Sequence, residues 1–445
     1  MSIGSDSMDQ KLYDLENKIL DALEGKFVNL KSDQKKYELV KSVAKSIKGD
    51  VSEDEVGEIF KDINDLSPID KLVTDQFVED IMVNNTKSIF YYHSQQGEKM
   101  LDKSFEDVEE LNAFVKKLRA YATNSAAKGN IFDVHMPSGS RANIVSSPLG
   151  YDITIRNFKG KALSIIDLIN LGVIDYSIAA RLWVYVDGFK ARPANILFGG
   201  MPAAGKTTML NAMFSFFRPE QRIVTIEETY ELDTTTQENC VRLETNEELT
   251  MQELVKNTLR MRPDMIIIGE VRGAEARDMV TAMNIGKNSM STIHASSTRD
   301  IVNRLENEPM NVPTEIIPAI DVLFVLSQVY MKGKPYRKVV QISEVSGMET
   351  KILLSDLYKY DYKTHQAAQI LPSVTYRDAL SKAIGVNPGD ILAEEMTRAA
   401  ILENMNKYGI RDMKQISQVV RDYYYSPEET LKKLGMNDIH PAIIV

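Results

Sequence analysis

The chain has 445 residues, of which 43% are hydrophobic, so it is long and apolar enough for two or three domains with real cores. Its net charge of −10 weakens any function that needs a broad basic surface, such as nonspecific nucleic-acid binding, although it does not exclude a local basic channel. The one cysteine, Cys240, excludes disulfides and cysteine-based zinc sites within one chain and favours the reducing cytoplasm.

No leader or membrane span is expected. The first residues have neither the basic start nor the apolar core of a signal peptide. No stretch approaches the ~20 apolar residues that cross a bilayer. If the protein works at a membrane, a partner must hold it there.

The first part of the chain predicts two modules. Apolar residues recur at helical spacing through residues 1–65, which predicts a small helical module. Residues 66–160 mix short strands, hairpin turns and one helix, as in an α+β domain. Arg141 and Arg156 lie there on predicted strands near turns, where each is either a surface arginine or an arginine finger. Residues 161–193 are interpreted as a linker and hinge.

Residues 194–208 carry the strongest signal. A short apolar strand is followed by the spacing G-x-x-x-x-G-K-[ST] and then by an apolar helix. Glycines let backbone N–H groups turn toward a phosphate, and the helix adds its free N–H groups and its dipole. Lys206 can reach the β- and γ-phosphates and the Thr207 hydroxyl can ligate Mg²⁺, whereas the alternative is a plain glycine turn. The residues expected to contact the nucleotide are Gly200, Pro202, Ala203, Ala204, Gly205, Lys206, Thr207, Thr208 and Arg272.

Strands and helices alternate after this loop, which predicts a parallel sheet with its ligand at the carboxyl ends of the strands. Four candidate catalytic residues lie at such ends: Glu227, Glu228, Glu270 and His294. Glu270 is expected to polarise the attacking water, or else to cap the following turn. Glu228 is the metal candidate beside Thr207, although the choice between Glu227 and Glu228 for the Mg²⁺ water shell stays open. His294 is expected to sense the γ-phosphate or bond an acid, with a satisfied core histidine as the alternative.

The nucleotide domain is expected to span residues 194–373, and residues 374–445 predict a helical extension. Positive charge for the transition state is expected from Arg272 and Arg277, or from Arg141 and Arg156 if another domain or subunit supplies it.

Four segments together resemble one known family. As a set they are similar to the Walker A, acidic box, Walker B and histidine box of the hexameric secretion and pilus-assembly ATPases of the type II/type IV superfamily. The chain also resembles the CpaF-like branch of tight-adherence pili through Gly139-Ser140-Arg141 and Thr154-Ile155-Arg156. The four segments are residues 199–208, 222–232, 262–272 and 282–295.

The resemblance implies an α/β fold: a RecA-like P-loop ATPase domain preceded by an α+β N-terminal domain and a small helical module, with a helical C-terminal extension. It implies Glu270 as the general base, Glu227 and Glu228 as assistants of the metal, and Arg141 and Arg156 as arginines that reach the nucleotide from the N-terminal domain. The implied cofactors are ATP and Mg²⁺. The implied assembly is a homo-hexamer, cytoplasmic and peripheral at the inner face of the cell membrane, where ATP-driven domain rotation acts on an inner-membrane platform protein.

Two departures from the family pattern bear on the chemistry. Lys287 stands near the place of an earlier histidine, and Pro202 has no N–H to donate to a phosphate. The expected function is an ATP-hydrolysing motor for pilus assembly or protein secretion, with no nucleic acid expected as a partner. Two alternatives stay open: a hexameric nucleic-acid translocase with a basic central channel, and a nucleotide-gated scaffold that binds ATP with little turnover.

Overall fold

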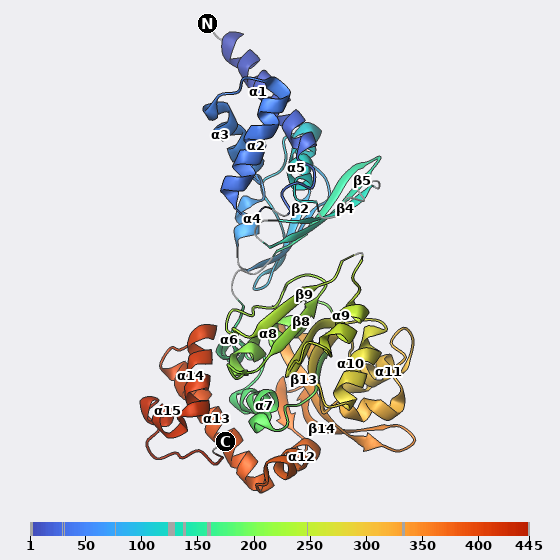
Figure 1. Cartoon of the computed structure of the whole chain (residues 1–445), viewed down its shortest axis with the longest axis vertical. Helices are drawn as coiled ribbons and strands as arrows, with labels where there is room; N and C mark the ends of the chain where they lie inside the picture. Colours follow the sequence, from blue (N-terminus) through green and yellow to red (C-terminus); the bar gives the residue numbers. More distant parts are fainter. Residues whose placement is uncertain are drawn as a thin grey trace. The chain divides into compact units, whose positions relative to one another are not determined.

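The chain forms two compact units, Met1–Lys161 and Ala162–Val445, in a computed structural model. Each unit has a hydrophobic core of its own. Figure 1 shows the first unit in blue to cyan and the second in green to red. The structure describes residues 3–28, 30, 32–75, 77–122, 130–136, 139–157, 162–246, 248–331 and 334–443.

The first unit contains a six-stranded antiparallel sheet in the order β3-β2-β1-β6-β5-β4. Buried and exposed residues alternate along β4, β5 and β6, so this sheet buries one face and exposes the other. The strands are β1 (Val78–Val83), β2 (Ile89–His93), β3 (Gly97–Met100), β4 (Ile131–His135), β5 (Arg141–Ser147) and β6 (Gly150–Arg156).

The helices of the first unit share one core with its sheet. Ile19, Val40 and Ile59, from three different helices, belong to the same buried cluster as Ile81 and Ile155 of the sheet. The boundary predicted at residue 65 therefore does not separate two cores, because the apolar faces of the helices are buried against the sheet. The helices are α1 (Ile3–Ala22), α2 (Asp33–Lys48), α3 (Glu53–Ile63), α4 (Asp70–Thr74) and α5 (Val108–Arg119).

The second unit is built on a nine-stranded sheet in the order β15-β14-β13-β12-β7-β11-β10-β8-β9. The strands from β12 to β9 in this order are parallel, and β13, β14 and β15 add an antiparallel edge. The strands are β7 (Ile196–Gly200), β8 (Ile223–Glu227), β9 (Cys240–Glu244), β10 (Met265–Val271), β11 (Asn288–Ile293), β12 (Val322–Met331), β13 (Lys334–Met348), β14 (Ile352–Asp361) and β15 (Gln366–Gln369).

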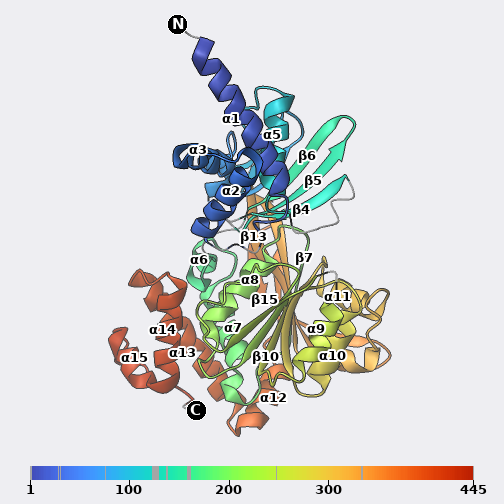
Figure 2. The same cartoon turned by 45° about the horizontal axis from the view of Figure 1, so that its top comes forward.

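Both faces of this sheet are covered, and β10 shows why its sequence is continuously apolar. Met265 and Ile267 enter the core on one face, whereas Ile266 and Ile268 enter the core on the other. Figures 1 and 2 show α9, α10 and α11 on one side of the sheet and α7, α8 and the C-terminal helices on the other. These helices are α7 (Tyr176–Asp187), α8 (Lys206–Ala212), α9 (Met251–Thr258), α10 (Glu275–Asn284), α11 (Thr298–Glu306), α12 (Thr375–Ile384), α13 (Pro388–Lys407), α14 (Met413–Tyr425) and α15 (Pro427–Lys433).

The segment expected as a linker over residues 161–193 folds differently where the structure describes it. Residues 162–193 contain α6 (Ile165–Asn170) and α7, whose side chains lie in the core of the second unit. From Ile178 to Asp187 every residue of α7 is buried. A segment with this much buried apolar surface is a structural part of the sheet domain, and its hydrophobic content is the reason.

Buried charges join the C-terminal helices to the sheet domain. Asp187, at the end of α7, contacts Arg218 Nε through Oδ1 at 2.5 Å and Arg398 Nη2 through Oδ2 at 3.0 Å. Arg398 Nε also donates to Glu394 Oε1 at 3.0 Å, and the Tyr423 hydroxyl donates to the same oxygen at 2.9 Å. Residues 374–445 are therefore integral to this unit. Among the described helices, none has the length and apolar character needed to cross a membrane.

Candidate functional site

Four parallel strands bring the phosphate-binding loop, Glu228, Glu270 and His294 to the carboxyl end of the sheet. In the sheet, β11 lies between β7 and β10, and β8 lies on the far side of β10. The phosphate-binding loop follows β7, His294 follows β11, Glu270 lies near the end of β10, and Glu228 follows β8. Parallel strands end at a common edge, so residues far apart in sequence meet there.

The loop after β7 closes tightly on itself. A Cβ at Gly200 would lie 2.7 Å from the Leu326 carbonyl oxygen and 3.0 Å from the Ala204 Cβ, so only glycine fits. Gly205 has a φ of 94°, which glycine adopts without strain. Ala203 has a φ of 61°, a left-handed conformation that costs an alanine roughly 1–2 kcal/mol.

Pro202 and Ala203 are exposed on this loop, whereas Ala204 is buried and Thr207 and Thr208 are half-buried in the first turn of α8. The Ala204 N–H bonds to the Met201 carbonyl at 3.2 Å and closes a four-residue turn with Pro202 at its second position. Proline presets that position of a turn, so here it serves the loop's shape and offers no N–H to a phosphate.

Lys206 lies over the loop and contacts His294. Its ammonium donates to the carbonyls of Gly200 at 2.9 Å and Met201 at 3.4 Å, and lies 3.3 Å from His294 Nδ1. With Nδ1 accepting from the ammonium, the ring proton is on Nε2, which lies 2.8 Å from Glu270 Oε1. Burial and the Lys206 charge lower the pKa of His294, which favours this neutral form. His294 thus connects the loop lysine to the predicted base and is not a core histidine.

Glu270 lies against Arg272 and His294 through both of its carboxyl oxygens. Arg272 Nη2 donates to Glu270 Oε2 at 3.1 Å, and Arg272 Nη1 donates to Glu228 Oε2 at 3.4 Å. The bond to Glu270 raises the pKa of Arg272. Glu270 Oε1 is buried and lies 3.0 Å from Arg272 Nε and 2.8 Å from His294 Nε2, although neither contact has the alignment of a hydrogen bond. A carboxylate oxygen that has close N–H neighbours but no aligned donor can still accept a bond from water, which suits a general base.

Glu227 and Glu228 lie in opposite environments. Glu227 is 2% exposed, and its Oε1 accepts from the backbone N–H groups of Glu231 and Leu232 at 2.8 and 2.9 Å. Burial raises the pKa of Glu227 to about 7. Glu228 is exposed and faces Arg272. Glu227 therefore holds the loop that follows β8, while Glu228 is the acid available to a metal's water shell.

Arg141 and Arg156 form a pair in the first unit. They stand directly opposite each other on β5 and β6. His135 of β4 stands opposite Arg141, and Asp80 of β1 stands opposite Arg156. Side chains at paired positions project from the same face of a sheet, so the two arginines lie next to each other in a row that His135 and Asp80 flank.

Arg337 belongs to the site region although no motif singles it out. It lies on β13, and its Nε donates to the Ala203 carbonyl in the phosphate loop at 2.8 Å. The only sequence signal for it is a basic residue beside a predicted hairpin turn, since 134 residues separate the two partners.

The cradle of backbone groups, lysine and hydroxyl fits a nucleotide triphosphate with Mg²⁺. Thr207, in the first turn of α8, would offer its hydroxyl to the ion, and Glu228 would bind its water shell. Mg²⁺ takes few protein ligands when phosphates supply the others, so a site without a cluster of acids is adequate. In the described part of the chain, no group of three or more His, Cys, Asp or Glu residues could hold a metal by itself.

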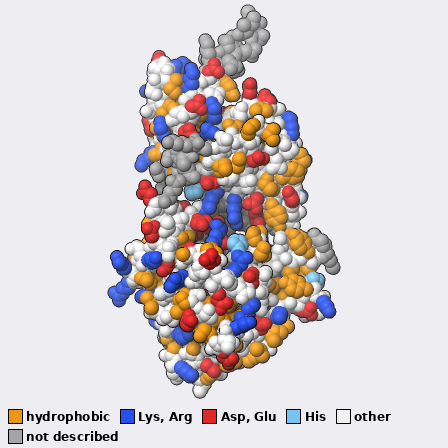
Figure 3. Space-filling model, turned by 90° about the vertical axis from the view of Figure 1, so that its right-hand side faces the viewer, with side chains coloured by type: hydrophobic (Ala, Val, Ile, Leu, Met, Phe, Trp, Pro, Cys, Tyr) orange, Lys and Arg blue, Asp and Glu red, His pale blue; other side chains and the backbone are white. Residues whose placement is uncertain are grey.

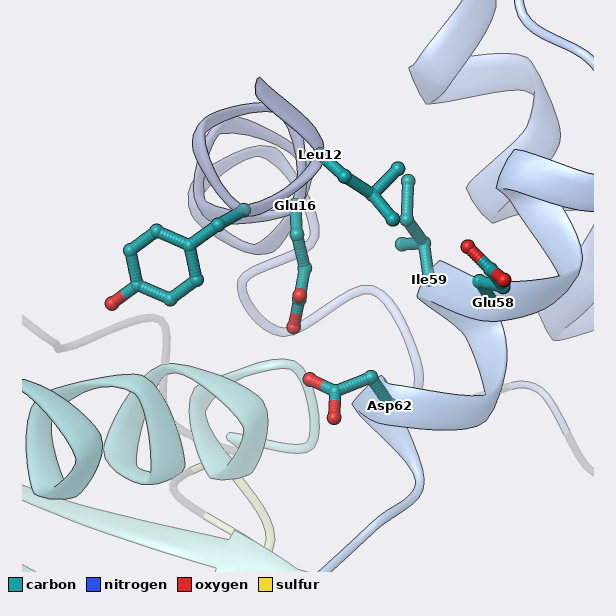
Figure 4. A pocket seen from close by; sticks show the side chains of 6 residues that line it. Leu12, Glu16, Glu58, Ile59 and Asp62 are labelled. Atoms are coloured by element: carbon teal, nitrogen blue, oxygen red, sulfur yellow. The ribbon is translucent and has the colours of Figure 1, made fainter. Parts of the chain in front are cut away.

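A separate pocket of about 210 Å³ lies in the first unit and contains none of the predicted site residues. In Figure 4 the carboxyl of Glu16 on α1 points toward that of Asp62 on α3. Burial, together with the Asp62 carboxyl, raises the pKa of Glu16 to about 8. Lys117 lies 2.7 Å from Asp62 and balances its charge, so this pocket is explained by helix packing.

The surface charges are mixed. On the face drawn in Figure 3, Lys and Arg side chains are interspersed with Asp and Glu side chains. A mixture of this kind produces no extended basic field for a polyanion on that face.

The chain is similar to known proteins in sequence and in fold. The family model for type II/IV secretion system proteins matches residues 62–353. An uncharacterized protein of Methanocaldococcus jannaschii is 31% identical over 380 residues, which cover 82% of this chain and 68% of that protein. The probable conjugal transfer protein TrbB of Sinorhizobium fredii is 29% identical over 244 residues, 52% of this chain and 72% of that protein.

Among solved structures, the Legionella pneumophila ATPase DotB is similar over 82% of this chain and 94% of that chain, with 15% identity and a TM-score of 0.46, which is a distant likeness of fold only. The family match extends over more than half of the chain, and it includes both the loop after β7 and the strand ends with Glu270 and His294. The chain therefore belongs to the type II/IV secretion system protein family, and it is an ATPase.

Proposed function

We propose that the chain is the subunit of a six-membered ring that hydrolyses ATP with Mg²⁺ and drives pilus assembly or protein secretion at the cytoplasmic membrane. The observation that carries this proposal is the connection from Lys206 through His294 to Glu270. A loop for the triphosphate and a base for water lie on one sheet edge, as hydrolysis requires.

The proposed reaction assigns one task to each group. Lys206 and the backbone of the loop hold the phosphates, and Thr207 and Glu228 would hold Mg²⁺, which would neutralise part of the phosphate charge when bound. Glu270 accepts the proton of the water that attacks the γ-phosphorus, while the bond to the β–γ bridging oxygen breaks and ADP leaves. His294 orients Glu270. Arg141 and Arg156 stabilise the charge that develops on the γ-phosphoryl group.

The finer assignment follows the sequence resemblance to the CpaF-like branch, which makes a tight-adherence pilus the proposed product. The relative named for conjugal transfer supports a role in moving macromolecules across an envelope. In that setting the protein is cytoplasmic, peripheral to the membrane, and transmits its motion to an inner-membrane platform protein. The ring, the location and the platform partner are all parts of the proposal.

The test compares ATP turnover of the full chain with that of Glu270→Gln, together with molar mass by light scattering. We expect a wild-type hexamer that hydrolyses ATP and a variant that binds ATP but is slower by about 100-fold or more. Equal rates would remove Glu270 from the role of base.

Two further results would change the assignment. Tight ATP binding with no turnover by the wild type would favour a nucleotide-gated scaffold. Strong stimulation of turnover by single-stranded DNA or RNA would favour a nucleic-acid translocase.

A further inference from the structure

Two strands extend past the edge of the sheet beside the phosphate loop. β12 pairs with β7 only from Val322 to Leu326, whereas it pairs with β13 as far as Met331 opposite Lys334. β13 pairs with β14 only from Gln341 onward. Residues 327–331 and 334–338 therefore form a two-stranded ribbon, which we call the overhanging ribbon, at the carboxyl end of β7.

The overhanging ribbon contacts the loop through Arg337. Its Nε donates to the Ala203 carbonyl at 2.8 Å. A Cβ at Gly205 would lie 3.3 Å from Arg337 Cδ, so the stem of Arg337 packs against the backbone of that glycine. One side chain thus contacts the loop at two positions, on either side of the buried Ala204.

The loop needs this support because of its own residues. A turn with proline at its second position and a positive φ at its third is normally completed by glycine or asparagine. Here the third position is Ala203, with a φ of 61°. A peptide's carbonyl and the next N–H point in opposite directions, so fixing the Ala203 carbonyl from outside also fixes the Ala203–Ala204 peptide plane.

We infer that Arg337 is a positioning residue of the ATPase site: it holds the strained Ala203 turn in the shape that accepts the nucleotide phosphates. Its role is specific to this Met-Pro-Ala-Ala loop, since glycine at position 203 would adopt the same φ unaided. Arg337 takes no part in proton transfer. The inference builds on the ATPase assignment, and measuring nucleotide binding separately from turnover tests it independently of the proposed motor function.

The experiment is a double-mutant cycle in the full chain with Arg337→Gln and Ala203→Gly. Arg337→Gln is expected to raise the KM for ATP and the Kd for Mg·ADP by about tenfold, with kcat changed less than about twofold, as for the loss of one charge-assisted hydrogen bond that acts on binding. In the Ala203→Gly background the same substitution is expected to change both constants by less than about threefold, because glycine needs no support. Lys334→Gln, on the same ribbon, is the matched control and is expected to leave both constants unchanged.

Equal effects of Arg337→Gln in the two backgrounds would overturn the inference, since they would show that Arg337 acts independently of the Ala203 strain. A fall in kcat at constant KM would also overturn it and would assign Arg337 to the transition state. If wild-type turnover is too slow to measure, the motor proposal fails. The Kd for Mg·ADP in the two backgrounds then still tests whether Arg337 acts through Ala203.

Discussion

Glu227 and Glu228 show how adjacent residues of one type acquire different tasks. The side chain of Glu227 turns into the protein, where two backbone N–H groups hold one oxygen and the other, Oε2, has no partner among the described residues. Gly269 makes this possible, because a Cβ there would lie 3.3 Å from Glu227 Cγ. Glu228 points to Arg272 and stays exposed.

The pKa of Glu227, about 7 in the folded protein, predicts a pH-dependent stability. The value in an unfolded chain is about 4.3, so the proton on Glu227 favours folding below that pH, and this contribution is lost as the pH rises through 7. Glu227→Gln keeps an acceptor for the two N–H groups without the charge. We expect the variant to match the wild type near pH 4 and to exceed its unfolding free energy by up to about 3 kcal/mol at pH 8.

Fluorescence of Trp183, the one tryptophan of the chain, reports urea unfolding of the second unit at each pH. Glu228→Gln, the exposed neighbour, serves as the comparison and is expected to show a much smaller pH-dependent difference. A stability difference for Glu227→Gln that is constant from pH 4 to pH 8 would contradict a buried, titrating carboxyl.

At the scale of single residues, the sequence identifies those residues whose role depends on a local motif. The glycines, Lys206 and Thr207 of the loop are such residues, because their spacing along the chain sets the geometry. It does not separate Glu227 from Glu228, since their difference is one of burial and arises only when the strands pack. Arg337 cannot be identified from the sequence either, because the residue that it contacts, Ala203, lies on a distant segment.

At the scale of elements, α13 buries charged residues beside apolar ones and leaves other apolar residues exposed. Glu394 and Arg398 are buried, whereas Leu392 and Met396 are exposed on the same helix. Arg398 forms ion pairs with Glu394 and with Asp187 of α7, which also pairs with Arg218. These ion pairs help to hold α13, whose sequence is only weakly amphipathic, against the sheet domain. Helicity after residue 374 follows from the sequence pattern, but this packing does not, because the partner charges lie far earlier in the chain.

We predict that Arg398→Met destabilises the second unit by about 3–5 kcal/mol, because Asp187 and Glu394 would stay buried with too little positive charge. Lys407→Met, at the exposed end of α13, removes the surface ion pair with Glu403 and is expected to change stability little. The measurement is again the urea midpoint from Trp183 fluorescence. Similar midpoints for the two variants would show that the buried ion pairs do not secure α13.

At the scale of the whole molecule, the paired Arg141 and Arg156 belong to one unit and Glu270 to the other. The ring in the proposed function would allow the arginines of one subunit to serve the site of a neighbour. We predict that Glu270→Gln and the double variant Arg141→Ala/Arg156→Ala are each nearly inactive, and that mixing them before assembly restores part of the ATP turnover. Mixed rings would then contain some sites with an intact glutamate and intact arginines.

The control is a mixture of Glu270→Gln with Lys206→Ala, two substitutions within the same unit, which is expected to restore nothing. If the arginine mixture is equally inactive although mass measurements show mixed rings, the arginines do not act across subunits. The two-unit division underlying this experiment follows partly from the sequence, which marks a change near residue 160. The apolar sequence of α7 indicates its deep burial, which the interpretation of residues 161–193 as a linker does not take into account.

The place of β11 in the sheet has a consequence for which nucleotide the enzyme can act on. Because β11 separates β7 from β10, the phosphate loop and Glu270 stand two strand spacings apart, roughly 10 Å. The spacing of the strands therefore helps to fix the distance between the phosphate loop and Glu270. In the proposed reaction a third phosphate and one water would occupy part of this separation, which a diphosphate would leave open. The spacing of the strands, together with the side chains of Lys206, His294 and Glu270, would then favour ATP over ADP as the nucleotide that reaches the base.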